Sequence, residues 1–129
     1  MAPGPDQPRR RGRLSRSGDF ERAYREGRSH ANRYLVLYAF SRPADEPADA
    51  RLGISVGRKL GGAVERNAIK RTLRDAFWAL SDGPPDSYDV VLVARPDLPG
   101  LVEREGSGGV EACLEELLRE GHLLGERKT

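Results

Sequence analysis

The sequence predicts an α+β fold, a two-layer sandwich in which helices cover one β-sheet. Three runs rich in β-branched and aromatic residues are typical of strands, and three other segments space their apolar residues as a helix does. These elements follow in the order α-β-β-α-β-α, which favours helices packed on a single sheet. With 129 residues, 37% of them hydrophobic, the chain is long enough for one domain with a modest core.

The two ends of the chain differ in composition from its middle. Prolines, glycines and arginines dominate residues 1–13, which predicts a disordered basic tail. We expect a single domain over residues 14–122 and a short C-terminal tail over residues 123–129. No stretch has the roughly 20 apolar residues of a membrane span, and the single cysteine excludes an internal disulfide. We therefore expect a cytoplasmic protein without a membrane partner.

The first element is expected to be a helix over residues 17–26. Ser17 is a candidate N-cap, and Gly27 is a candidate stop signal. Three residues at positions i, i+3 and i+4 form one apolar stripe on this helix: Phe20, Ala23 and Tyr24.

Two strands are expected next, over residues 34–40 and 51–58. The nine residues between them, 42–50, are enough for an antiparallel hairpin. The first strand is apolar on both faces, whereas the second is nearly bare on the face that carries Gly53 and Ser55. Two interpretations of the bare face stay open. It forms the floor of a groove for a flat ligand such as a base, or its glycines permit a bulge or close helix packing.

The second half of the chain contains three further elements. A helix is expected over residues 63–80, after two glycines, and a strand over residues 88–95. That strand is so continuously apolar that we expect it at the centre of the sheet. A loose loop over residues 98–109 and an acidic amphipathic helix over residues 110–118 complete the expected domain.

Positive charge is concentrated on one side of the helix over residues 63–80. At about 100° per residue, five polar side chains share that side: Arg66, Asn67, Lys70, Arg71 and Arg74. Cations spaced four residues apart on one helix repel each other unless an anion lies between them. Arg58 and Lys59 precede the helix and extend the basic stretch. A stripe of this kind, rich in arginine, predicts contact with the phosphates of a nucleic acid.

The run GRKLGGAVERNAIKRTLRDAF, at residues 57–77, carries a more specific signal. It resembles the signature of the bacterial ribonuclease P protein family, whose hallmark is Arg-Asn-Arg followed by Ile/Val-Lys-Arg and a further arginine. The likeness extends in order over roughly residues 13–120. Ala68 stands where the family has the second arginine of the hallmark, and we expect it to remove one contact rather than the function.

The resemblance implies a protein subunit that assembles with a large catalytic RNA. The holoenzyme of that family removes the 5′ leader of precursor tRNA by magnesium-dependent hydrolysis. The chemistry belongs to the RNA, so no catalytic or metal-binding residue is expected in the protein, and Mg²⁺ is held mainly by the RNA and the substrate. The resemblance also implies a ribosomal-protein-like second-domain fold with a left-handed β-α-β crossover, and a protein that is monomeric by itself.

Two sets of site residues follow from the resemblance. The set expected to bind the RNA subunit comprises Arg58, Lys59, Arg66, Asn67, Lys70, Arg71 and Arg74. The set expected to form a cleft for the single-stranded leader comprises Phe20, Tyr24 and Tyr38, with Arg33 and Ser55 as weaker candidates at its rim. Aromatic rings stack on unpaired bases with little sequence preference, although an ordinary core position stays open for Phe20.

Two other functions are considered from the residues. A nuclease that acts by itself needs converging carboxylates or a pair of catalytic side chains, whereas His30 and His122 lie in unlike sequence contexts. A stand-alone RNA-binding or ribosome-associated protein would use the same basic helix. Two separate surfaces, one aromatic and one basic, would favour the ribonuclease P subunit, and one continuous patch would favour the stand-alone protein.

Overall fold

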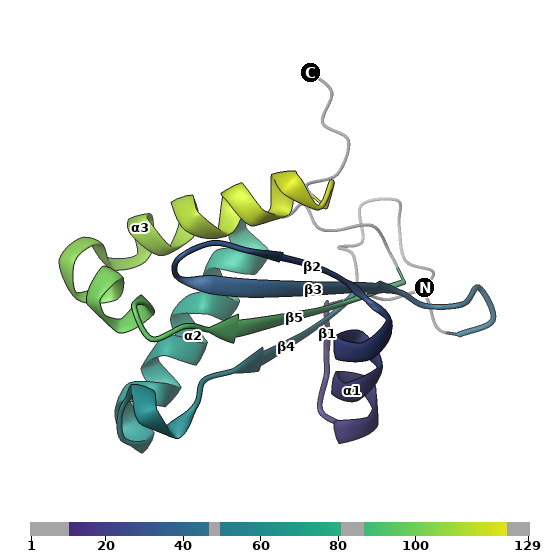
Figure 1. The fold of residues 1–129 in the computed structure, drawn as a ribbon, viewed down its shortest axis with the longest axis horizontal. Helices are drawn as coiled ribbons and strands as arrows, with labels where there is room; N and C mark the ends of the chain where they lie inside the picture. The colour runs from purple at the N-terminus through teal and green to yellow at the C-terminus, as the bar shows by residue number, and fades with distance from the viewer. Residues whose placement is uncertain (1–10, 47–49, 81–86, 124–129) are drawn as a thin grey trace, which may run out of the picture.

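The structure is a computed structural model that describes residues 11–46, 50–80 and 87–123. Five strands of the described chain form one sheet in the order β1-β4-β5-β3-β2, accompanied by three α-helices (Figure 1). The elements are β1 (Arg11–Arg13), α1 (Ser17–Glu26), β2 (Arg28–Ala31), β3 (Leu35–Ser41), β4 (Ala50–Ser55), η1 (Arg58–Leu60, a 3₁₀ helix), α2 (Ala63–Leu80), β5 (Tyr88–Ala94) and α3 (Leu98–Glu120).

The central strand is β5, as the sequence predicts, because its apolar side chains are buried on both faces of the sheet. Val90, Val91 and Leu92 have no exposed surface. β5 pairs antiparallel with β3 and parallel with β4. The expected hairpin between residues 34–40 and 51–58 is therefore wrong, since β5 lies between these two strands. The more apolar strand takes the central position.

Helices cover the two faces of the sheet unequally. α2 and α3 pack on one face and enclose the main core, which contains Leu37, Leu52 and Leu92 from the sheet. This arrangement is the predicted two-layer sandwich. α1 packs on the opposite face over a smaller cluster that contains Ala23 and Val91. On that face Val36, Tyr38 and Phe40 of β3 are only half-buried.

α1 and α2 have the bounds that the sequence predicts, although the expected cap of α1 is wrong. Arg16 is the N-cap residue, and no side chain caps that end. Gly27 is the C-cap residue of α1, as expected. A larger residue would not fit there, because a Cβ would lie 2.6 Å from the Ala23 carbonyl oxygen. The ends of β3, β4 and β5 differ from the expected ends by no more than one residue, except at the C-terminal end of β4. Arg58, which was expected in that strand, belongs to η1.

Four further segments correct the expectations from sequence. Residues 11–13 form the edge strand β1, parallel to β4, instead of belonging to a disordered tail. Residues 98–109 are helical and continue into the expected last helix across a kink at Gly106, where φ is 63°. β2 is a polar strand that the sequence pattern did not indicate. Leu123, expected in the C-terminal tail, is 1% exposed and belongs to the main core.

The rest of both expected tails lies outside the described residues. Within the described part of the chain, no helix combines the length and the apolar character needed to cross a bilayer.

Candidate nucleic-acid interface

α2 presents its basic side to solvent because its other side is held in the core. Ile69, Leu73, Ala76 and Phe77 are buried against the sheet and α3. The basic side and the preceding 3₁₀ helix together form a surface that we call the α2 basic surface. Its residues are Arg58, Lys59, Arg66, Asn67, Lys70, Arg71 and Arg74, which are exposed or half-buried. The structure thus brings together all seven residues of the predicted RNA-subunit set.

The cations of the α2 basic surface have no acidic partner in the part of the chain that the structure describes. Among residues 11–46, 50–80 and 87–123, no carboxylate lies within 4.0 Å of their charged nitrogen atoms. Within the described part of the chain, Arg66 alone of these cations has a side-chain hydrogen bond, which Nε donates to the Gly61 carbonyl oxygen at 3.1 Å. By contrast, Arg22, Arg33 and Arg119 each form an ion pair. The α2 basic surface therefore keeps its positive charge available for an external anion.

Three aromatic rings come together on the opposite face of the sheet, and we call them the aromatic cluster: Phe20, Tyr24 and Tyr38. The Tyr24 and Tyr38 rings meet edge to face with centroids 4.9 Å apart, and the Phe20 and Tyr24 centroids lie 6.3 Å apart. Tyr24 is 41% exposed. Burial raises the pKa of its hydroxyl, and a hydrogen bond with Ser55 acts in the opposite direction. Ser55, a predicted rim residue, thus lies at this cluster.

Sheet register explains why Tyr38 and the bare face of β4 belong together. Gly53 pairs with Val91, and Val91 pairs with Tyr38, so these three residues form one row across the sheet and share a face. Phe20 lies against Gly53, where a Cβ would be 2.6 Å from the ring. This contact favours close helix packing over the open groove floor at Gly53. Phe20 is half-buried, so it is both a packing residue and an accessible ring.

Arg33 is the one predicted leader residue that the structure does not bring to the aromatic cluster. Its Nε donates to Asp97 Oδ2 at 2.8 Å, and its guanidinium lies 5.7 Å from the centroid of the Tyr34 ring. The ion pair raises the pKa of Arg33 and lowers the pKa of Asp97. Arg33 therefore lies near the start of α3.

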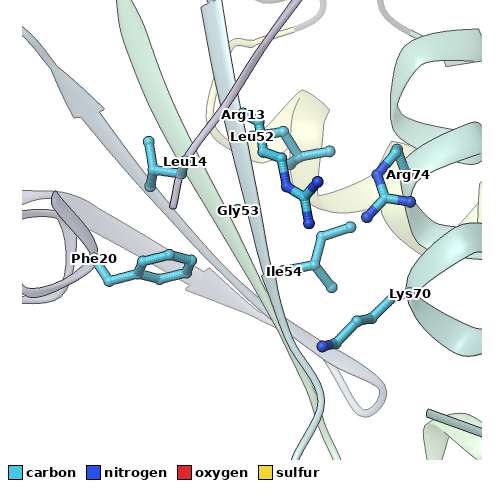
Figure 2. A pocket seen from close by; sticks show the side chains of 8 residues that line it. All are labelled: Arg13, Leu14, Phe20, Leu52, Gly53, Ile54, Lys70 and Arg74. Carbon is cyan, nitrogen blue, oxygen red and sulfur yellow. The ribbon is translucent and has the colours of Figure 1, made fainter. Parts of the chain in front are cut away.

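A small pocket connects the two surfaces at the edge of β4 (Figure 2). It has a volume of about 70 Å³, with Phe20 on one side and Lys70 and Arg74 of α2 on the other. β1 contributes Arg13, whose guanidinium points toward Arg74. The aromatic and basic surfaces thus lie on different faces but meet at this edge. Sequence reasoning missed Arg13 because it assigned the residue to the tail; the buried Leu14 that follows is the signal that could have shown otherwise.

Comparison with known proteins identifies the family that this chain resembles. The sequence profile of the family described as Ribonuclease P matches residues 9–120. The ribonuclease P protein component of Enterococcus faecalis is 35% identical over 116 residues, which cover 90% of this chain and 93% of that protein. The corresponding protein of Streptococcus pyogenes serotype M5 is 38% identical over 112 residues, 87% of each chain.

Solved structures show the same fold. The RNase P protein of Staphylococcus aureus superposes with a TM-score of 0.76 at 32% identity, covering 88% of this chain and 97% of that one. The RNase P protein of Thermotoga maritima gives a TM-score of 0.70 at 32% identity, with 84% and 96% covered. The profile match over most of the chain, the identity to these relatives and the shared fold lead to one conclusion: this chain belongs to the ribonuclease P protein family.

Proposed function

We propose that this chain is the protein subunit of a ribonuclease P ribonucleoprotein that removes the 5′ leader of precursor tRNA. In this proposal the RNA subunit performs the hydrolysis, and the protein binds that RNA and the single-stranded leader. Mg²⁺ belongs mainly to the RNA and the substrate. Among the described residues, no three His, Cys, Asp or Glu side chains converge to hold a metal ion.

The proposal rests on two kinds of surface that lie on different faces of the sheet, one basic on α2 and one aromatic beside α1. The cations of the α2 basic surface have no acidic partner in the described chain, and phosphates would relieve their mutual repulsion. Such contacts supply affinity that falls with salt but carry no base specificity. They suit a large structured RNA whose backbone is the recognised feature. We therefore assign the RNA subunit to this surface.

The aromatic cluster supports the second half of the proposal. Its three rings come from α1 and β3 and lie beside Ser55 of β4, on the face that α1 covers only in part. Stacking on unpaired bases contributes about 1–3 kcal/mol per base and tolerates any sequence. The leaders of different precursor tRNAs differ in sequence, so stacking fits this substrate better than base-specific hydrogen bonds do.

The proposal is tested by cleavage of precursor tRNA at low Mg²⁺ concentration. The matching RNA subunit is assayed with this protein, without it, and in the presence of the variants Arg66→Ala and Tyr38→Ala. We expect efficient cleavage only from the combination. Arg66→Ala should weaken assembly with the RNA, whereas Tyr38→Ala should weaken binding of leader-containing substrate and leave assembly intact.

Arg119→Ala is the matched control, because Arg119 is exposed on α3 and pairs with Glu115 within that helix. A protein that binds RNA but adds nothing to cleavage would instead be a stand-alone RNA-binding protein. Cleavage by the protein without RNA, abolished by mutation of the protein, would contradict both functions.

A further inference from the structure

A buried carboxylate lies at the end of the sheet next to the aromatic cluster. Asp89 of β5 has no exposed surface. Arg51 of β4 donates two hydrogen bonds to it, from Nε to Oδ1 at 2.8 Å and from Nη2 to Oδ2 at 2.9 Å. The buried Arg42 donates to Oδ1 as well. A carboxylate this deep is tolerated only with such partners.

The ion pairs around Asp89 extend to α1. Arg22 of α1 lies 3.6 Å from Asp89 Oδ2 and donates to both carboxylate oxygens of Glu46, at 3.0 and 3.2 Å. The guanidinium of Arg22 also lies 4.7 Å from the centroid of the Phe40 ring. We call the whole group the Asp89 cluster: Asp19, Arg22, Arg42, Glu46, Arg51 and Asp89.

The charges of the Asp89 cluster balance, with three arginines and three carboxylates. In this respect it is unlike the α2 basic surface, and it has no surplus charge for an external anion. Its members come from α1, the segment after β3, β4 and β5. In the described structure, the Asp89 cluster connects α1 to the sheet.

The position of Arg22 on α1 determines what this connection controls. Ala23 is fully buried against the sheet. At about 100° per residue, Arg22 lies to one side of Ala23 and Tyr24 lies to the other side at an equal angle. Ala23 by itself is too small to fix the rotation of α1 about its own axis, and Phe20, one turn earlier, adds one further packing contact at Gly53. The ion pairs of Arg22 hold one flank of α1, and that fixes how far Tyr24 on the other flank reaches over Tyr38.

We propose that Arg22 is a positioning residue for the leader-binding cleft. Through Glu46 and Asp89 it holds α1 in the rotation that places the Tyr24 ring edge to face with Tyr38. Arg22 itself contacts no RNA in this proposal. The inference rests on the proposed function, since it concerns the cleft assigned there to the leader.

The test uses the reconstituted holoenzyme with precursor tRNA that carries a five-nucleotide leader and with leaderless tRNA. The ratio of the two affinities measures the gain that the leader provides. We expect Arg22→Met to reduce this gain about threefold to tenfold. This loss corresponds to part of the free energy of one base-stacking contact. Affinity for the RNA subunit and for leaderless tRNA should not change. Arg25→Met removes the same charge from the same helix and should keep the full gain, because Arg25 is exposed and its one acidic partner among the described residues is the neighbouring Glu26.

A second measurement separates positioning from general destabilisation. If Arg22 acts through the aromatic cluster, Arg22→Met added to Tyr24→Ala should cause no further loss of the leader gain. Should Arg22→Met fail to fold, Arg22→Lys keeps the charge but loses the two-pronged bond to Glu46, and we expect a smaller loss of the gain. An unchanged gain in the folded variant, or additive losses in the double variant, would overturn the inference. A wild-type holoenzyme without any leader gain would instead overturn the proposed function.

Discussion

The ring of Phe20 lies directly on the backbone of Gly53. A Cβ at residue 53 would lie 2.6 Å from Cζ of this ring and 2.8 Å from Cε1. Only glycine leaves room for Phe20 at this distance, so the bare face of β4 is what lets α1 bring its aromatic residues down to the sheet. The shape of the candidate leader cleft thus depends on a residue that has no side chain.

Gly53→Ala should displace Phe20. The added methyl group overlaps the ring and Leu14 Cβ, which lies 3.0 Å from the same point. We expect the free energy of unfolding to fall by about 1–3 kcal/mol, the usual effect of overpacking, together with a loss of leader affinity. Urea unfolding and binding of leader-containing tRNA measure the two effects. Gly18→Ala on α1 is the control, since nothing lies within 4 Å of its added Cβ; equal effects of both variants would contradict this explanation.

Arg74→Ala should reduce the salt dependence of RNA binding. Arg74 has no acidic partner among the described residues; it lies one turn after Lys70 on α2 and faces Arg13 of β1 across the pocket at β4. Loss of one phosphate contact lowers the slope of log K against log salt concentration by about 0.7–0.9. Binding of the RNA subunit between low and moderate salt measures that slope. Arg119→Ala should leave it unchanged, and an unchanged slope in Arg74→Ala would place Arg74 outside the interface.

Asn32→Ala should destabilise the fold without changing the α2 basic surface. The Asn32 side chain accepts hydrogen bonds from the backbone N–H groups of Tyr34 and Leu35, both at 3.0 Å. It also donates to the Cys113 carbonyl oxygen at 3.0 Å and so connects β3 with α3. We expect a loss of about 1–3 kcal/mol in the free energy of unfolding, because partly buried partners lose their bonds. The exposed Asn67 provides the control for thermal unfolding: Asn67→Ala should change stability by no more than about 0.5 kcal/mol.

Stability should fall at alkaline pH through Cys113. Burial, with a smaller contribution from Glu116, raises the pKa of this thiol from 9.0 to about 11. Below pH 9 the thiol is protonated in both the folded and the unfolded chain. Between pH 9 and 11 the unfolded chain releases the proton while the folded chain retains it, so unfolding becomes more favourable as pH rises.

Cys113→Ala lacks this titration. The stability difference between wild type and Cys113→Ala, measured by urea unfolding, should therefore narrow from pH 8 to pH 10.5. A constant difference would show that Cys113 titrates alike in both states.

Local signals were enough to predict both ends of α1 and α2. Gly27 and the two glycines before Ala63 interrupt helical periodicity, and the apolar spacing between them identifies the buried side. The basic side of α2 follows directly from that spacing. The same reasoning failed for residues 98–109, which were expected to form a loose loop and are helical. Buried Leu98, Leu101 and Val110 continue as helix across the kink at Gly106.

Strand pairing could not be predicted from local signals, because the partner of a strand is chosen among distant segments. A short connector favoured a hairpin between β3 and β4, yet β5 buries more apolar surface by lying between them. β2 carries no alternating pattern and is recognisable only through its pairing, for example of Ser29 with Tyr38.

The sequence by itself determined the chemistry of this protein: an arginine-rich helix, aromatic residues spaced along the first helix, and the signature of the family. The sequence did not show which arginines form ion pairs with carboxylates of the same chain. Arg22 and Arg51 are held by Asp89 and Glu46, whereas Arg71 and Arg74 have no acidic partner in the described chain. Only the tertiary structure decided this, because a charge is neutralised by its neighbours in space, and those neighbours come from distant strands and loops that folding brings together.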